Sequence, residues 1–563
     1  MYSIYEKINQ QIEMVVKNAM DVAEKNEQLV EIELPEIMIE KPREATFGDF
    51  STNIAMQIVK QVKKAPRQIA EIIVQNINTE GTFINKVDVA GPGFINFYLD
   101  NEWLYETLNL IDERKEHYGE VNIGKGSKVM VEFVSANPTG PLHMGNARGG
   151  ALGDCIASVL EKSGHEVTRE FYVNDAGNQM ERFGASLEAR YLQQLNGENS
   201  VEFPEDGYQG ADIIEHAKAY IIEYGSVLLE KSSEERRKAL IDYALPKNLK
   251  QIHSALARYG IHYDCWFKES TLYANEIDET MNILKERGYL VEKEGAIWLD
   301  GEKGGLEKDE VLIRQNGFPT YMAADIAYHR NKFIKRGFDI VINLWGADHH
   351  GHVARMKTAM EAIGVSKDRL HIVLFQLVNL YQNGEIKRMG KRSGRAISLE
   401  DLLDEVGVDA ARFFFNMKTS GSHLDFDMDL AVEQSNNNPV FYVQYAHARI
   451  CNIIKRLKEE NIERIPSDKI NLTLLTQSEE LNLIKRLAEY PEEIILSAQT
   501  FEPSRLTHYV MNVAADFHSF YNACRVRGEQ EDLLQARLFL VYCTKIVIKN
   551  VLDLLSIDAP ERM

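Results

Sequence analysis

A histidine and a glycine lie at the kind of turn where α/β proteins bind phosphate. His143 and Gly145 stand in HMGN (143–146), between an apolar stretch, KVMVEFVSA (128–136), and a helix-like run of small residues. The tripeptide alone carries no weight, because 15 His and 36 Gly in 563 residues predict about one His-x-Gly by chance. The surrounding sequence is informative, because a turn from a buried parallel strand into a helix N-terminus favours the binding of anions. We therefore expect phosphate binding here.

A second, strongly basic segment supplies the cations that a polyphosphate needs. KRMGKRSGR (387–395) has five basic residues and no acid, and Gly390 and Gly394 disfavour a regular helix. Such a loop can close over phosphates, where a protein acts chiefly by positioning groups and neutralising charge. The sequence has no GxxxxGK[ST], GxSxG or HExxH motif, which argues against a P-loop NTPase, a serine hydrolase and a zincin.

Two further motifs offer polar groups for a nucleotide and its co-substrate. GFPTYMAAD (317–325) places Tyr321 and Asp325 one helical turn apart, so both can face one pocket. WGADHHGH (345–352) follows a buried strand; Gly346 permits close backbone approach, and Asp348 can accept from a ribose hydroxyl. Its three histidines lack a matching carboxylate or cysteine set, so we expect no metal site.

Composition restricts the class of protein. The net charge of −21 argues against nucleic acid at face value, but 41–67 carries six Lys/Arg against two acids, so a local basic face remains open. The five cysteines are scattered, which predicts neither disulfides nor a thiolate zinc site and fits a reducing cytoplasm. No apolar run is long enough to span a membrane, and the N-terminus is not a signal peptide.

The pattern of apolar residues predicts three domains. Helical spacing over 1–24 and alternation around Gly-Pro-Gly in 88–100 indicate an α+β domain over 1–110. Alternating strand and helix patterns then predict an α/β Rossmann-like domain with a parallel sheet over 111–434. Helix follows helix over 435–563, which predicts an all-α bundle. Individual elements are expected as strands at 166–173, 339–344 and 370–377, helices at 53–77 and 352–363, and a helical insertion at about 195–290.

Longer strings resemble one known family. HMGN resembles the HIGH signature of class I aminoacyl-tRNA synthetases, and RMGKR (388–392) resembles a degenerate KMSKS. The strings that resemble bacterial arginyl-tRNA synthetases, in order and over essentially the whole chain, are VEFVSANPTGPLHMGNARGGALGD, REFYVNDAGNQ, PTYMAADIAYH, WGADHHGH, QYAHARI and FYNACRV. The resemblance implies activation of L-arginine by ATP with Mg²⁺, giving arginyl-adenylate, and transfer to the terminal adenosine of tRNA(Arg), with tRNA needed for the first step.

The resemblance also implies which residues form each site. The residues implied to bind ATP are His143, Gly145, Asn146, Gly346, Asp348, His349, His352, Met389 and Lys391, of which His143, Gly145, Asn146 and Lys391, with Arg388, act in catalysis. Those implied to bind arginine are Glu132, Ser135, Asn137, His143, Tyr321 and Asp325. Those implied to bind tRNA are Phe94 and Asn96 near the tRNA elbow, and Tyr445, His447, Arg449 and Met563 near the anticodon.

The residue chemistry agrees with this assignment. A guanidinium is a planar fork of hydrogen-bond donors. A carboxylate with a phenol and an amide nearby fits this fork better than it fits the point charge of lysine. Three departures from the family's motifs concern rate rather than identity: Asn146 replaces the second His of HIGH, and Arg388 and Gly390 replace the first Lys and the Ser of KMSKS. Phe94, Tyr445, His447, Arg449 and Met563 have a second interpretation as structural residues.

Three alternatives remain to be tested against this assignment. A small-molecule adenylating ligase would share the HIGH-type site but leaves the helical domain with QYAHARI unexplained. A cysteinyl-tRNA synthetase needs a thiolate zinc site, which the cysteine spacing does not offer. An RNA-binding paralogue without catalysis would be expected to lose His143, Asp348 or Lys391, and all three are present. We expect a monomer without zinc or a tightly bound cofactor.

Overall fold

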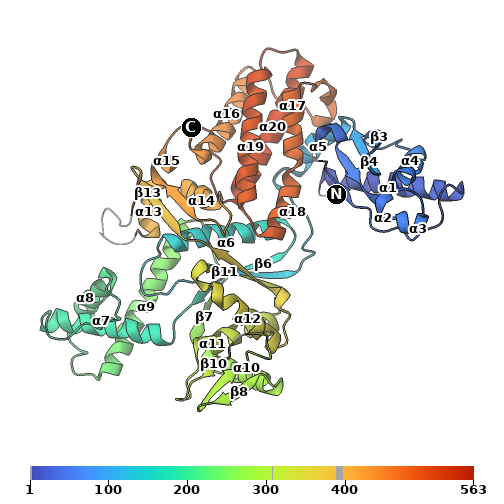
Figure 1. Ribbon diagram of the computed structural model, residues 1–563. Coiled ribbons are helices and arrows are strands. Elements are labelled where there is room, and N and C mark those ends of the chain that lie inside the picture. The colour runs from blue at the N-terminus through green and yellow to red at the C-terminus, as the bar shows by residue number, and fades with distance from the viewer. Residues whose placement is uncertain (1–2, 43, 307, 388–396) are drawn as a thin grey trace.

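The computed structural model describes residues 3–42, 44–306, 308–387 and 397–563. An N-terminal domain and a C-terminal helical bundle lie on one side of a central α/β domain, and two excursions of that domain project from the other side (Figure 1). In the described ranges, no helix combines the length and apolar character needed to cross a membrane.

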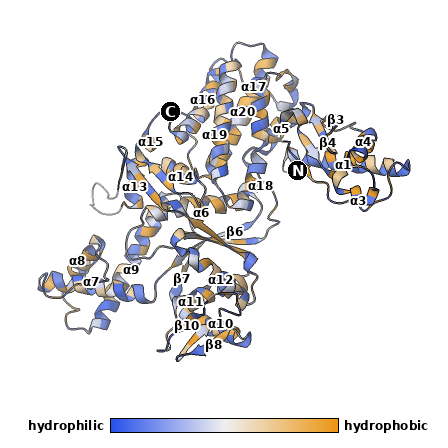
Figure 2. Cartoon of the chain, viewed as in Figure 1, coloured by the Kyte–Doolittle hydropathy of each residue, from blue (hydrophilic) through white to orange (hydrophobic). Residues whose placement is uncertain are grey.

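The central sheet is parallel throughout, which confirms the expected fold of this domain. Its strand order is β12-β11-β5-β6-β7. The strands are β5 (Lys128–Glu132), β6 (Glu166–Val173), β7 (Cys265–Lys268), β11 (Ile340–Gly346) and β12 (Leu370–Phe375). Buried apolar residues dominate β5 and β11, as expected for strands covered on both faces, and Figure 2 colours β11 largely as hydrophobic.

Helix α6 (Met144–Lys162) packs unusually close to the end of β5 because glycines line its contact face. A Cβ added at Gly153 would lie 2.2 Å from the ring of Phe133, and one at Gly150 would lie 2.8 Å from Ile261. The small-residue run of the sequence therefore has a packing role: it brings the first turn of α6 up to the carboxyl edge of the sheet.

The first excursion is helical, with bounds that differ from the prediction. It comprises α7 (Asn178–Asn196), α8 (Ala211–Tyr224) and α9 (Ser233–Arg258). The predicted range 195–290 begins after most of α7 and includes β7, an edge strand of the main sheet. The prediction failed here because β7 has only four residues, too few for a recognisable pattern between two helices.

The second excursion carries a small antiparallel sheet between helices. Its elements are α10 (Glu276–Glu286), β8 (Leu290–Lys293), β9 (Ala296–Leu299), β10 (Glu310–Ile313) and α11 (Tyr321–Arg330), followed by a π-helical turn, η4 (Asn331–Lys335). The chain then returns to the main sheet through β11, α12 (His350–Ala362) and β12. The helix and the strands predicted at 352–363, 339–344 and 370–377 are thus confirmed with shifts of one or two residues.

The N-terminal domain packs helices on an antiparallel sheet of order β1-β2-β4-β3. Its elements are α1 (Ile4–Lys25), β1 (Ile39–Glu40), β2 (Phe50–Thr52), α2 (Ile54–Gln57), α3 (Val59–Val62), α4 (Pro66–Gln75), β3 (Ile84–Ala90), β4 (Phe94–Leu99) and α5 (Glu102–Arg114). The single helix expected at 53–77 is broken, because Lys63 adopts a left-handed conformation (φ 56°) and Pro66 begins a new helix.

The remaining elements link the sheet to the C-terminal bundle. They are β13 (Val378–Gln382), β14 (Glu385–Ile386), α13 (Leu399–Val406), α14 (Val408–Asn416), β15 (Leu424–Asp427), α15 (Met428–Val432), α16 (Pro439–Glu459), α17 (Ser478–Ala488), α18 (Tyr490–Thr500), α19 (Ser504–Ala523) and α20 (Glu531–Leu554). Their alternating apolar and polar faces in Figure 2 are those of amphipathic helices that bury one side.

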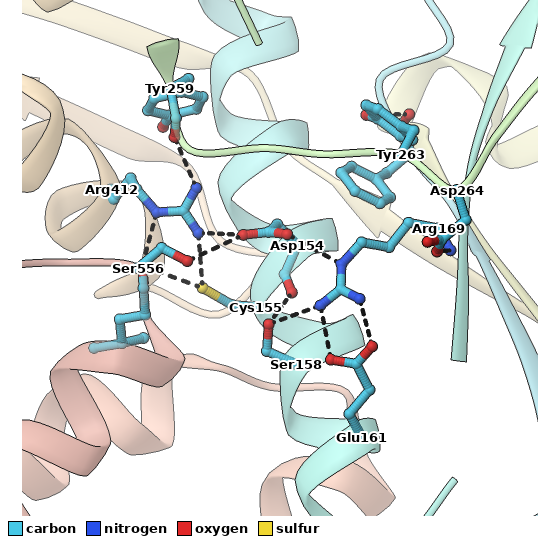
Figure 3. Close-up of polar contacts among 12 residues, drawn as sticks. Asp154, Cys155, Ser158, Glu161, Arg169, Tyr259, Tyr263, Asp264, Arg412 and Ser556 are labelled. Carbon is cyan, nitrogen blue, oxygen red and sulfur yellow. Dashed lines mark hydrogen bonds and ion pairs between the residues drawn. The ribbon is translucent and has the colours of Figure 1, made fainter. Parts of the chain in front are cut away.

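A buried arginine joins the central domain to the end of the bundle (Figure 3). Arg412 on α14 is 0 % exposed and forms an ion pair with Asp154 on α6. It also donates to the carbonyls of Tyr259 (3.0 Å), just after α9, and Leu555 (2.7 Å), just after α20. This arginine therefore connects the helix behind the phosphate turn to two other parts of the fold.

Candidate functional site

A cavity of about 1090 Å³ lies at the carboxyl edge of the central sheet. Its walls come from the turn after β5, the ends of β6, β11 and β12, the first turn of α6, helix α11, and the loop before α8. Residues predicted for arginine and ATP that line it are Glu132, Ser135, Asn137, His143, Asn146, Asp325, Gly346, Asp348, His349 and His352. The carboxyl edge of a parallel sheet is where this kind of fold binds ligands.

The turn after β5 is strained and well anchored. Val134 and Ser135 have φ angles of 66° and 41°, in the left-handed region that non-glycine residues, and β-branched ones above all, avoid. The Ser135 hydroxyl donates to Glu132 (3.0 Å) and accepts from the backbone N–H of Tyr172 on β6 (3.1 Å). Strain of this kind persists where the surroundings enforce it, typically at functional sites. Here it aims Ser135 and Asn137 into the cavity.

The first turn of α6 keeps its anion-binding character. The Asn146 side chain accepts from the backbone N–H of His143 (3.0 Å), which caps the helix. Partial burial lowers the pKa of His143, which favours the neutral imidazole, and a neutral ring can still donate a hydrogen bond to a phosphate. Space around Gly145 is open. The arrangement fits the predicted roles of these residues in ATP binding.

Asp325 on α11 reaches the opposite side of the cavity. Its carboxylate receives a hydrogen bond from His352 Nε2 (3.0 Å), whose ring packs near Trp345. Tyr321, one turn earlier, is half-exposed near Gly177 and is not among the lining residues. The structure thus brings Asp325 together with Glu132 and Ser135, while Tyr321 stands at the rim.

The first glycine of WGADHHGH, Gly346, lies directly beside the Asp348 carboxylate. A Cβ at Gly346 would lie 2.4 Å from the Asp348 carboxylate, although Gly346 itself has an ordinary φ of −60°. The side chain of Asp348 is 80 % exposed to the cavity and its surroundings, within 3.6 Å of His349. An exposed carboxylate beside bare backbone suits the ribose contact predicted for this motif.

Arg388 and Lys391, predicted to be catalytic, and Met389, predicted to bind ATP, lie outside the described residues. The described segment that follows lies next to the site, since Ser398 pairs with His143 and the Leu399 N–H donates to the Leu142 carbonyl (2.8 Å). The residues that follow the basic segment are therefore held next to the first turn of α6.

The residues predicted for tRNA differ in accessibility. Phe94 is exposed at the start of β4, so its second interpretation, as a structural aromatic residue of the core, is wrong, whereas Asn96 is 3 % exposed within the sheet. Arg449 packs over the ring of Tyr445 and donates to its hydroxyl (2.9 Å).

His447 is buried and donates to the Pro560 carbonyl (2.9 Å), so it fastens the C-terminal tail to α16. Met563 is exposed. The direct tRNA contacts predicted for Asn96 and His447 stay predictions, and each would require a buried side chain to become accessible.

The described residues contain no group of His, Cys, Asp and Glu arranged to hold a metal ion. Sequence reasoning missed several polar residues of the site. Tyr172, Asn174 and Gln179 line the cavity, as do Tyr208, Gln209, Gly210 and Asp212 from the first excursion. Lys332 lies beneath it, buried against Glu132. Only Lys332 had a usable signal, because it lies two helical turns after Asp325 and so on the same face.

Comparison with known proteins agrees with this geometry. Three family models cover the chain: the arginyl tRNA synthetase N-terminal domain at 6–99, the catalytic domain of class I (R) tRNA synthetases at 107–456, and the DALR anticodon binding domain at 443–563.

Curated relatives and a solved structure extend the match to the full length. The arginine–tRNA ligases of Ruminiclostridium cellulolyticum and Acetivibrio thermocellus are 64 % and 63 % identical to this chain over 564 residues, covering 100 % of each chain. The fold also matches the arginyl-tRNA synthetase of Thermus thermophilus (TM-score 0.72, 23 % identity), over 97 % of this chain and 99 % of that one. The family models and the full-length relatives account for the parallel sheet, its cavity and the two accessory domains. The chain therefore belongs to the arginyl-tRNA synthetases, the class I ligases that join arginine to tRNA.

Proposed function

We propose that the cavity at the carboxyl edge of the sheet holds ATP and L-arginine side by side and performs both steps of arginylation. The observation that carries this is the meeting of an anion-binding helix N-terminus, at His143, with a carboxylate wall, at Glu132 and Asp325, in one cavity. A phosphate-binding side next to a cation-binding side suits an arginine carboxylate placed for attack on the α-phosphate of ATP.

In this arrangement the residues have separate tasks. The α6 N-terminus with His143 and Asn146 binds the phosphates, and Gly346 with Asp348 binds the ribose. Asp325 and Glu132, with Ser135 and Asn137, bind arginine, and Tyr321 covers it from the rim. Lys391 and Arg388, by analogy with KMSKS, neutralise charge on the departing pyrophosphate, with Mg²⁺ entering on ATP.

The accessory domains are proposed to bind tRNA(Arg). Support comes from Phe94, an exposed aromatic side chain suited to stacking on a base, and from Arg449 and Tyr445 on α16. The free thiols of the five cysteines fit a cytoplasmic location. Action as a monomer is part of this proposal.

The test is ATP–pyrophosphate exchange with each amino acid, with and without tRNA. The proposal predicts exchange with arginine alone among the amino acids, and only when tRNA is present. Exchange with cysteine or glutamate, or none with arginine plus tRNA, would overturn it. Exchange with arginine in the absence of tRNA would remove the proposed tRNA dependence while leaving the substrate assignment intact.

A further inference from the structure

A lysine is buried directly beneath the arginine side of the cavity. Lys332 is 0 % exposed, and its ammonium forms an ion pair with Glu132, which itself is 8 % exposed and lines the cavity. Its other contacts are the side-chain oxygen of Asn343 on β11 (3.1 Å) and the face of the Tyr328 ring (4.0 Å). These three contacts equal in number the three N–H donors of the ammonium.

The contacts continue behind the lysine as a chain of polar groups. The Asn343 amide donates to His329 Nε2 (2.8 Å), and His329 Nδ1 donates to the backbone carbonyl of Asp325 (2.7 Å). Burial and the nearby Lys332 charge hold the pKa of His329 well below its usual range, so the ring is neutral and has one donor and one acceptor, as these two contacts require. Glu132 and Asp325 are therefore connected through the protein interior.

The local backbone is adapted to this placement. Lys332 lies in the π-helical turn that extends α11. Such turns are rare in proteins, and those that occur are often found at functional sites. A buried ion pair is a poor source of stability, because desolvation of both charges offsets their attraction, and a well-packed apolar pair often replaces it without loss. Its presence at the wall of a binding cavity therefore calls for another reason.

We propose that Lys332 is a positioning residue for arginine recognition, which fixes the Glu132 carboxylate in the orientation that receives the substrate. One oxygen of Glu132 is held by Lys332 and the other by Ser135, so the side chain has no freedom to rotate out of the wall. Lys332 also limits the charge of this wall: with Glu132 balanced, Asp325 is left as the net negative charge for one guanidinium. This inference rests on the proposed role of Glu132 in binding arginine.

The experiment compares arginine KM and ATP KM in tRNA-dependent pyrophosphate exchange for four variants. They are Lys332→Met, Glu132→Gln, the double variant, and Lys335→Met as a matched control. Lys335 lies in the same π-helical turn but is part-exposed and paired with Glu276 and Glu279, away from the cavity.

We expect Lys332→Met to raise arginine KM on the order of 10- to 100-fold, as for loss of a buried charged contact, with ATP KM changed by less than about twofold. Lys335→Met should leave both constants within about twofold of the wild type. In the Glu132→Gln background, Lys332→Met should add less than about threefold to arginine KM, because Lys332 acts through Glu132.

An unchanged arginine KM in Lys332→Met would overturn the proposal. So would the same fold-increase with and without Glu132, or a parallel rise in ATP KM, which a merely structural lysine would cause. If Lys332→Met fails to fold, comparison of Glu132→Gln with the double variant still tests the proposal. An arginine KM more than about threefold higher in the double variant than in Glu132→Gln contradicts action through Glu132. If the wild type shows no exchange with arginine, the proposed function itself fails; if it does show exchange, the variants test Lys332 alone. A normal arginine KM in Glu132→Gln would refute the role of both residues.

Discussion

The buried Arg412–Asp154 pair offers a quantitative test of how helix α6 is held in place. Arg412→Met keeps the apolar volume of the side chain but removes its guanidinium, which leaves Asp154 with Arg169 as its remaining cation (Figure 3). The carbonyls of Tyr259 and Leu555 lose their donor at the same time. Breaking one partner of a buried pair costs about 3–5 kcal/mol, because the other partner stays buried.

The assay is thermal unfolding, with a surface pair as control. At roughly 2–4 °C per kcal/mol for a large domain, a loss of about 4 kcal/mol lowers the apparent Tm by about 10 °C. Arg258→Met removes the same type of group from an ion pair with Asp404 in which both side chains are 44 % exposed. We expect that control to cost less than about 1 kcal/mol. Equal shifts for the two variants would refute the view that burial gives the Arg412 contact its weight.

Three further predictions concern the cavity and its surroundings. Asp325→Asn should raise arginine KM by roughly 10- to 100-fold, because it removes a charged acceptor, with tRNA affinity nearly unchanged; an unchanged KM would exclude Asp325 from the pocket. Gly346→Ala should raise ATP KM by roughly 2- to 10-fold, because its Cβ forces the Asp348 carboxylate aside, and an effect on arginine KM alone would contradict this. Burial, with the charges of Asp325 and Asp175, raises the pKa of Glu269 to about 7, so its contribution to stability is complete below its unfolded pKa and is lost as pH rises through about 7. Glu269→Gln should therefore flatten the fall in Tm between about pH 5 and pH 7, and parallel curves for variant and wild type would disprove the shift.

The parallel sheet and its ligand turn could be predicted because their signals are local. The apolar run at 128–136 and the small residues after His143 each indicated one element, and their order placed the turn at the carboxyl edge. The structure adds the reason for the glycines, which is the approach of α6 to Phe133.

Other features depend on contacts that no local pattern records. The four residues of β7 form a strand only because β6 lies beside them, and the helix expected at 53–77 breaks where Lys63 takes a left-handed conformation. Lys332 was not predicted: its spacing from Asp325 indicates a shared helix face, but its burial against Glu132 is a tertiary contact that the sequence does not record. Buried polar pairs are specified by tertiary contacts, so a single sequence conceals them.

The most direct test of the site is a crystal structure of this protein with tRNA and a non-hydrolysable sulfamoyl analogue of arginyl-adenylate. The account predicts the guanidinium at Asp325, the ribose at Gly346 and Asp348, and the sulfamoyl group at the first turn of α6 beside His143. A guanidinium directed toward the 208–212 loop, or an adenosine bound away from β11, would contradict the assignment.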